Sequence, residues 1–208
     1  MERLSISILD ADLINIEKVL EELKEQGVKR IHLDILDTSF VENISFGTGI
    51  VNEITSRYNF IFDIHIMVNN PVDVLCRLNI GDVDSVTIHW ECEGFKKASE
   101  YLDSVECSFK KGIAISPGTF IHDVCLESFD MVTIMSVQPG KGGQKFIENT
   151  VKKIGDIKAK IKACVDGGIN LDTISKVKDF DIIVIGSAYF KAEDKKKFLE
   201  RAIEIIKE

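Results

Sequence analysis

The segment from residue 4 to residue 12 reads Leu4-Ser5-Ile6-Ser7-Ile8-Leu9-Asp10-Ala11-Asp12. Its first six residues are apolar or small, as expected for a short strand that is buried in a sheet. The turn after this strand contains two aspartates and lacks the Gly-x-Gly-x-x-Gly pattern with which an open doubly wound sheet binds a nucleotide. The opening of the chain therefore argues against that fold and favours the other parallel α/β architecture, a closed barrel.

Seven further strand candidates follow along the chain, each bounded by Gly, Asp, Asn or Pro. Together with Leu4–Leu9, the predicted strands are Arg30–Ile35, Phe60–Ile66, Ser85–Trp90, Gly112–Ser116, Met131–Val137, Ala163–Asp166 and Ile182–Ile185. Helical patterns lie between them and are clearest at Ile14–Gln26, Phe146–Ile161 and Lys195–Ile206. The first pattern predicts an apolar stripe of Ile16, Val19, Leu20 and Leu23, and the second predicts one of Ile147, Val151, Ile154 and Ile157 or Lys158. Eight such units predict an α/β protein with the (β/α)8 TIM-barrel fold, for which 208 residues is close to the lower limit. No linker interrupts the pattern, so residues 1–208 are predicted to form a single catalytic domain.

Composition and charge exclude several classes of function. The net charge of −8 argues against binding to nucleic acid or to anionic membranes, which requires a basic surface. No apolar run approaches the roughly 20 residues that span a bilayer. The five cysteines are widely spaced and form no Cys-x-x-Cys pair, which is typical of a reduced intracellular protein. We therefore expect a cytoplasmic protein that binds neither nucleic acid nor membranes.

Four side chains with metal-binding chemistry lie near the ends of predicted strands. His32 and Asp34 share one face of the second strand, His65 lies in the third strand and Asp166 ends the seventh. If these faces point into the barrel, the four side chains converge at its C-terminal mouth. Two imidazoles and two carboxylates suit one divalent metal ion, with Zn²⁺ favoured and Fe²⁺, Mn²⁺ or Co²⁺ as alternatives.

Glycine-rich loops follow the last three predicted strands. They are Ser136 to Gln144, Gly167-Gly168 and Gly186-Ser187-Ala188. In TIM barrels the loops after the seventh and eighth strands commonly bind phosphate, because glycines let backbone N–H groups approach the anion closely. The sequence thus predicts a barrel enzyme that acts on a small phosphorylated substrate.

Several motifs, in this order, resemble the ribulose-phosphate 3-epimerase family over nearly the whole chain. Ser7-Ile8-Leu9-Asp10-Ala11-Asp12 is similar to its S-I-L-x-A-D, and His32-Leu33-Asp34-Ile35-Leu36-Asp37 to its H-x-D-x-M-D. Asp63-Ile64-His65-Ile66-Met67 with Asn70-Pro71 is similar to D-x-H-x-M followed by N-P. The most specific match is Met135-Ser136-Val137-Gln138-Pro139-Gly140-Lys141-Gly142-Gly143-Gln144-Lys145-Phe146, which resembles M-S-V-x-P-G-F-G-G-Q-x-F.

The resemblance implies a barrel of the ribulose-phosphate-binding type and assigns roles to individual residues. The metal ligands would be His32, Asp34, His65 and Asp166, of which Asp34 and Asp166 would also form the catalytic acid/base pair. Residues expected to contact the sugar or the reacting carbon are Ser7, His65, Met67 and Met135. The phosphate would be bound by Gly140, Lys141, Gly142, Gly143, Gly167, Gly168, Gly186 and Ser187. The reaction expected is interconversion of D-ribulose 5-phosphate and D-xylulose 5-phosphate at C3 through a cis-enediolate, a step of the pentose phosphate pathway.

The chain departs from the family pattern beside the expected site. Thr38-Ser39-Phe40-Val41-Glu42-Asn43 stands in place of G-H-F-V-P-N, and Lys141 replaces a usual Phe. The changed 38–43 loop leaves open a 3-epimerase of a ketohexose 6-phosphate. A non-catalytic barrel that only binds sugar phosphates is a further alternative, against which the intact set of His32, Asp34, His65 and Asp166 argues. His89 is predicted to face the interior, either lining the sugar site or hydrogen-bonding within the barrel. Because barrels of this family often associate, a homo-oligomer is a further expectation.

Overall fold

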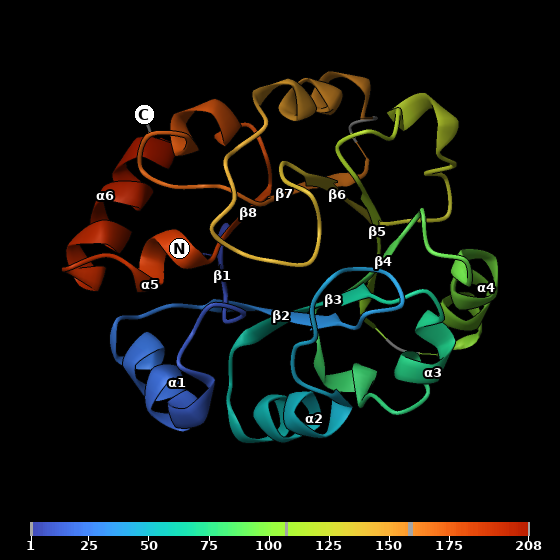
Figure 1. The fold of residues 1–208 in the computed structure, drawn as a ribbon, viewed down its shortest axis with the longest axis horizontal. Helices are drawn as coiled ribbons and strands as arrows, with labels where there is room; N and C mark the ends of the chain where they lie inside the picture. The colour runs from blue at the N-terminus through green and yellow to red at the C-terminus, as the bar shows by residue number, and fades with distance from the viewer. Residues whose placement is uncertain (1, 107, 158–159, 208) are drawn as a thin grey trace.

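Eight parallel strands form a closed barrel in the computed structural model, which describes residues 2–106, 108–157 and 160–207 (Figure 1). The strands are β1 (Leu4–Ser7), β2 (Arg30–Leu36), β3 (Ile61–Met67), β4 (Ser85–His89), β5 (Lys110–Ile115), β6 (Met131–Met135), β7 (Lys162–Asp166) and β8 (Ile182–Ile185). Each strand pairs with its neighbours in sequence order, and β1 closes the sheet against β8. The predicted (β/α)8 fold is confirmed, and strand ends differ from the predicted ones by at most two residues.

Helices cover the outer face of this barrel (Figure 1). The α-helices are α1 (Ile16–Glu25), α2 (Thr48–Arg57), α3 (Pro71–Leu75), α4 (Phe95–Ser104), α5 (Ser187–Phe190) and α6 (Lys195–Lys207). Short 3₁₀ segments occupy Leu13–Asn15, Ile80–Asp82, Ile121–Asp123, Glu148–Asp156 and Ile174–Val177. Of the apolar positions of the first helical pattern, Val19, Leu20 and Leu23 are buried, and Ile16 is partly buried against the core. Gly27 ends that helix with a φ of 76°, a conformation that glycine adopts readily.

The helix predicted over Phe146–Ile161 is wrong in type and in length. Residues Glu148–Asp156 form a 3₁₀ helix, and Ile147, predicted to lie on the buried stripe, is 38% exposed. Thr150 and Val151 are β-branched and Gly155 is a poor helix former, so this segment has little intrinsic α-helical preference. Lys158, also considered for that stripe, lies outside the described residues.

The two faces of the barrel wall have different composition. Side chains that point outward toward the helices are mostly aliphatic and fully buried, among them Ile6, Ile31 and Ile64. Inside, Met131, Cys164, Ile182 and Val184 form a small apolar cluster. Cys164 is therefore buried in the barrel.

The interior near the N-terminal ends of the strands is ionic. Asp63 is buried and accepts hydrogen bonds from Ser5 Oγ at 2.8 Å and Ser85 Oγ at 2.9 Å. It also forms an ion pair with Arg30, whose guanidinium lies 2.9 Å from Asp84 as well. Because every charge in this cluster has a partner, it can remain buried below the site described next.

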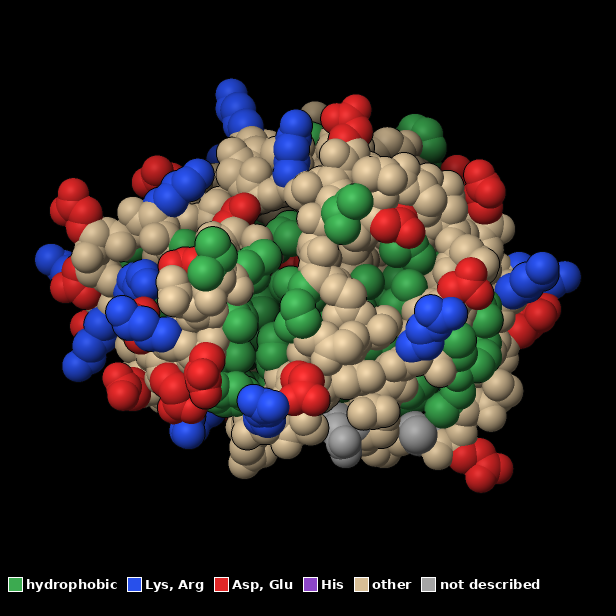
Figure 2. Space-filling model, turned by 60° about the horizontal axis from the view of Figure 1, so that its bottom comes forward, with side chains coloured by type: hydrophobic (Ala, Val, Ile, Leu, Met, Phe, Trp, Pro, Cys, Tyr) green, Lys and Arg blue, Asp and Glu red, His purple; other side chains and the backbone are tan. Residues whose placement is uncertain are grey.

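Some apolar side chains remain on the surface. Figure 2 shows several on the face that carries α1 and α2, and Ile14 and Ile44 are 94% and 66% exposed. Within the described ranges, the structure contains no helix with the length and apolar character needed to cross a membrane.

Candidate active site

The four predicted metal ligands meet at the C-terminal rim of the barrel. One ligand atom from each of His32, Asp34, His65 and Asp166 lies within 4.8 Å of the other three. The backbone register explains this convergence, because Asp34 of β2 is paired directly with His65 of β3. His32 and Asp34 occupy alternate positions of one strand and so point to the same side. Asp166 approaches from β7, at the end of its strand.

The spacing of these donor atoms fits a tetrahedral ion. His65 Nδ1 lies 3.4 Å from Asp34 Oδ1 and 3.4 Å from Asp166 Oδ2. His32 Nε2 lies 3.2 Å from His65 Nδ1, 3.4 Å from Asp34 Oδ1 and 3.8 Å from Asp166 Oδ2. A Zn²⁺-like ion with ligands at about 2.1 Å separates those ligands by about 3.4 Å. The residues present therefore fit a divalent metal ion.

The charges in the cluster stabilise each other. Burial opposes a charge on His32, but Asp34 and Asp166 raise the pKa of this imidazole to about 9. Burial also opposes a charge on His65, but hydrogen bonds to Asp166 and Asp34 raise the pKa of this imidazole. The pKa of Asp34 lies well below its usual range, because the two imidazoles outweigh burial there too. The cluster thus holds positive charge at neutral pH, which either protons or a metal cation can supply.

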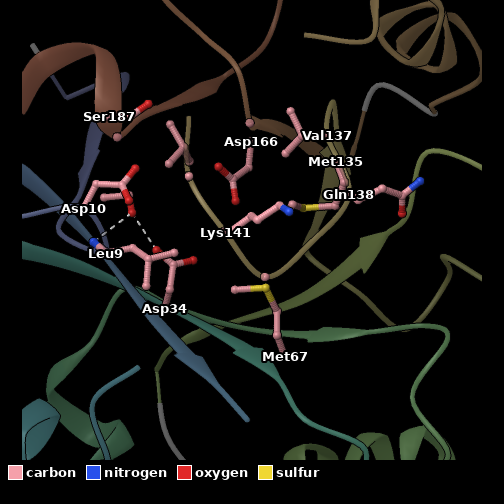
Figure 3. A pocket seen from close by; sticks show the side chains of 16 residues that line it. Leu9, Asp10, Asp34, Met67, Met135, Val137, Gln138, Lys141, Asp166 and Ser187 are labelled. Carbon is pink, nitrogen blue, oxygen red and sulfur yellow. Dashed lines mark hydrogen bonds between the residues drawn. The ribbon is translucent and has the colours of Figure 1, made fainter. Parts of the chain in front are cut away.

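A pocket opens directly beside the four ligands. Its lining consists of Ser7, Leu9, Asp10, Asp34, Met67, Met135, Val137, Gln138, Gly140, Lys141, Gly142, Asp166, Gly167, Val184, Gly186 and Ser187. In Figure 3 the carboxylates of Asp34 and Asp166 lie on two sides of this space, and Lys141 points into it. Ser7 Oγ donates a 2.6 Å hydrogen bond to Asp34 Oδ2 and thereby fixes the carboxylate.

Most residues predicted for substrate binding line this pocket, but three do not. His65, Gly143 and Gly168 are absent from the lining, and Gly168 packs against the backbone of Phe146. Gly167 has a φ of +110°, and a Cβ there would lie 2.3 Å from Val137. The turn after Asp166 therefore requires glycine.

Sequence reasoning missed two charged residues at the glycine loops. Asp10 lies against Gly142, where an added Cβ would come within 1.6 Å of its Oδ2. Lys191 Nζ would lie 3.3 Å from a Cβ on Gly143, and its charge acts on the Asp10 carboxylate. The position of Asp10 just after the first strand was a usable signal. Nothing in the local sequence marks Lys191, which the end of α5 brings to this place.

The loop that departs from the family pattern packs against Gly140 of the glycine loop. Asn43 Nδ2 donates a 3.2 Å hydrogen bond to the carbonyl of Gly140, and Val41 lies against the same glycine. The altered segment 38–43 therefore contacts the glycine loop directly.

His89 hydrogen-bonds within the barrel, which confirms one of the two alternatives predicted for this residue. Burial lowers the pKa of His89 to about 4. Burial also opposes the charge of Glu91, but hydrogen bonds from His89 and Thr119 lower the pKa of this carboxyl to about 2. A neutral imidazole therefore lies beside an ionised carboxylate. His122 is exposed.

The closed (β/α)8 barrel and its rim cluster define a barrel protein with a candidate divalent-metal site beside a loop-lined pocket. The chain belongs to the ribulose-phosphate 3 epimerase family, whose model matches residues 3–190, and is thus an isomerase that acts on carbohydrates. It is 43% identical over 199 residues to the ribulose-phosphate 3-epimerase of Encephalitozoon cuniculi, covering 95% of this chain and 92% of that protein. It is 32% identical to the corresponding Chlamydia muridarum protein, covering 90% of this chain and 87% of that protein.

The fold has neighbours among solved structures. The 3-hexulose-6-phosphate synthase of Salmonella typhimurium superposes with a TM-score of 0.70 at 14% identity, covering 98% of each chain. At that identity the likeness concerns the fold alone.

Proposed function

We propose that this protein interconverts D-ribulose 5-phosphate and D-xylulose 5-phosphate, with Asp34 and Asp166 as the proton-transferring pair. The observation that carries this assignment is the placement of the two carboxylates. They come from β2 and β7, three strands apart around the barrel, and face one pocket from two sides (Figure 3). Epimerisation requires removal of a proton from one face of a carbon and delivery to the opposite face, and this arrangement suits both steps.

The reacting proton lies on C3, next to the C2 carbonyl. One carboxylate removes it, which leaves an enediolate, and the other carboxylic acid returns a proton to the opposite face. Ser7 holds Asp34 through its 2.6 Å hydrogen bond, so this carboxylate has a fixed direction. Met67 and Met135 supply apolar walls that keep water from the reacting carbon. His32, Asp34, His65 and Asp166 would hold a divalent metal ion, which would supply Lewis-acid stabilisation of negative charge.

The phosphate is assigned to the glycine loops. Gly140, Gly142, Gly167, Gly186 and Ser187 all line the pocket away from the histidines. Lys141 points into the same space, and Lys191 lies behind Gly143. Two lysines near exposed backbone N–H groups favour a dianionic group at this end of the substrate.

We favour a pentulose phosphate over a ketohexose 6-phosphate. The pocket is small, at about 50 Å³, and Asn43 and Val41 of the 38–43 loop pack against Gly140 in its lining. The shorter sugar requires the smaller displacement of the glycine loop. We further propose Zn²⁺ as the resident ion, one catalytic domain over the whole chain, a cytoplasmic location and a homo-oligomeric assembly.

Proton NMR of ribulose 5-phosphate in D₂O with the Zn²⁺-loaded protein tests the reaction. We expect xylulose 5-phosphate to form with deuterium at C3. Asp34→Asn and Asp166→Asn should each abolish conversion, and binding of Zn²⁺ by each variant is measured separately. Absence of C3 exchange with Zn²⁺ bound would refute the proposal, and faster exchange in a ketohexose 6-phosphate would transfer it to the longer sugar.

A further inference from the structure

His89 and Glu91 lie outside the ligand cluster and extend it through a chain of hydrogen bonds that begins at His65. His65 Nε2 lies 2.9 Å from His89 Nε2, and His89 Nδ1 lies 3.2 Å from Glu91 Oε2. Both imidazoles are fully buried, so water does not compete for these contacts. A continuous path therefore runs from the candidate metal site to a carboxylate beyond the end of β4.

The contacts allow a single arrangement of protons when a metal is bound. A cation at the cluster takes the lone pair of His65 Nδ1, because this nitrogen faces both carboxylates at 3.4 Å. The ring proton of His65 then lies on Nε2 and is donated to His89 Nε2. His89 must accept through Nε2, so its own proton lies on Nδ1 and is donated to Glu91.

Glu91 is itself held from the other side. Its Oε1 accepts a 2.7 Å hydrogen bond from the backbone N–H of Ser116 and another from the Thr119 hydroxyl. Lys153 Nζ donates at 3.0 Å to the carbonyls of Ser116 and Pro117, which fixes the loop that supplies that N–H. The two carboxylate oxygens of Glu91 thus have different partners, Oε1 on the Ser116–Thr119 side and Oε2 on the His89 side.

The second histidine ligand lacks such support. His32 Nδ1 is buried and has no hydrogen-bond partner among the described residues. The orientation of His65 is therefore the better defined of the two imidazoles. Partners of this kind on a ligating histidine commonly change metal affinity 10- to 100-fold when removed.

We infer that Glu91 and His89 are positioning residues that fix the tautomer and ring orientation of His65 as a metal ligand. This inference rests on the proposed function, because it requires that the cluster bind a metal ion. Neither residue lines the pocket, so their effect on the reaction passes through His65.

Glu91→Gln tests the inference with little change in shape. A glutamine has one carbonyl oxygen and cannot accept from both His89 and the Ser116–Thr119 side. If the NH₂ group of this glutamine faces His89, Nδ1 of His89 must accept, so the proton of His89 moves to Nε2. That proton would then point at the proton on His65 Nε2. We expect Zn²⁺ affinity, measured by competition with a chelator, to fall 10- to 100-fold. Thr119→Val is the matched control, because it removes a hydrogen bond to Oε1 and leaves Oε2 facing His89; its affinity should stay within about threefold of wild type.

The ¹⁵N NMR spectrum of the Zn²⁺-loaded wild-type protein supplies a second readout that needs no variant. It should show His65 protonated at Nε2 and His89 protonated at Nδ1, and the latter signal should change in Glu91→Gln. If the wild type binds Zn²⁺ and Glu91→Gln binds it equally tightly, the inference is overturned and the proposed function remains intact. A His89 proton on Nε2 in the wild type would also overturn it. A wild-type protein that binds no divalent ion would overturn both.

Discussion

Gly167 connects the catalytic candidate Asp166 to the phosphate loops, and its replacement by alanine has a cost that can be divided into two parts. Its φ of +110° is a conformation that side chains disfavour, at about 1–3 kcal/mol. The new Cβ would lie 2.3 Å from Val137 Cγ2, an overlap that costs about 1–3 kcal/mol more. We expect Gly167→Ala to destabilise the protein by about 2–6 kcal/mol.

The substitution should also reduce turnover. Ser136 donates to the carbonyl of Asp166 through its backbone N–H at 2.7 Å and to that of Gly167 through Oγ at 2.6 Å. A change of φ at residue 167 disturbs both contacts and moves the Asp166 carboxylate. A displacement of 1 Å at a catalytic group can lower the rate about 100-fold.

Thermal unfolding and epimerisation rates are measured for the wild type, Gly167→Ala, Val137→Ala and the double variant. The comparison separates the steric overlap from the backbone strain. Val137→Ala removes the two methyl groups that lie 2.3 and 3.0 Å from the new Cβ and leaves the backbone strain, so the double variant should recover about 1–3 kcal/mol relative to additivity. Gly118→Ala is the control, because nothing lies within 4 Å of its Cβ position and its φ is not positive; it should be neutral or slightly stabilising. Strictly additive effects at residues 137 and 167, or wild-type stability of Gly167→Ala, would refute the reasoning.

Four further predictions concern charge and hydrogen bonding. Because the folded pKa of His32 is about 9 against an ordinary 6.5, Zn²⁺ binding at pH 7.5 should release about one proton, visible by calorimetry in buffers of different ionisation enthalpy. The same shift should make the metal-free protein lose stability as the pH rises from 6.5 through 9, because the stabilising charge on His32 is lost there; a rising melting temperature would contradict this. Asp63→Ala should cost about 3–5 kcal/mol in chemical denaturation, because Arg30 loses a buried partner, with Zn²⁺ affinity unchanged. Ser7→Ala should lower the epimerisation rate about 10-fold or more by freeing Asp34, and a wild-type rate would contradict that role.

The strands and the ligand cluster could be predicted because both depend on short-range patterns. Strands buried on both faces are aliphatic runs, and alternation within a strand places His32 and Asp34 on one side. Parallel strands then bring their C-terminal ends to one rim, so Asp166 joins the group although it lies more than 100 residues away in the sequence.

The remaining features depend on loop conformation, which no periodicity encodes. Lys191 reaches the glycine loop only because α5 ends beside it, and the contact of Asp10 with Gly142 joins two distant loops. The path from His65 to Glu91 needs the exact side-chain directions of two adjacent strands. The 3₁₀ segment Glu148–Asp156 was mistaken for an α-helix because its apolar spacing satisfies both periods.

The pairing of Asp34 with His65 in the backbone register has a consequence for metal exchange. Hydrogen bonds between β2 and β3 hold the two ligands at their spacing whether or not an ion is present. The geometry of the cluster therefore does not depend on a bound metal, unlike that of small zinc domains whose folding depends on the ion. A metal bound at the proposed site would exchange without unfolding of the chain. The identity of the ion would then be set by the supply of free ions in the cell and by their intrinsic order of affinity.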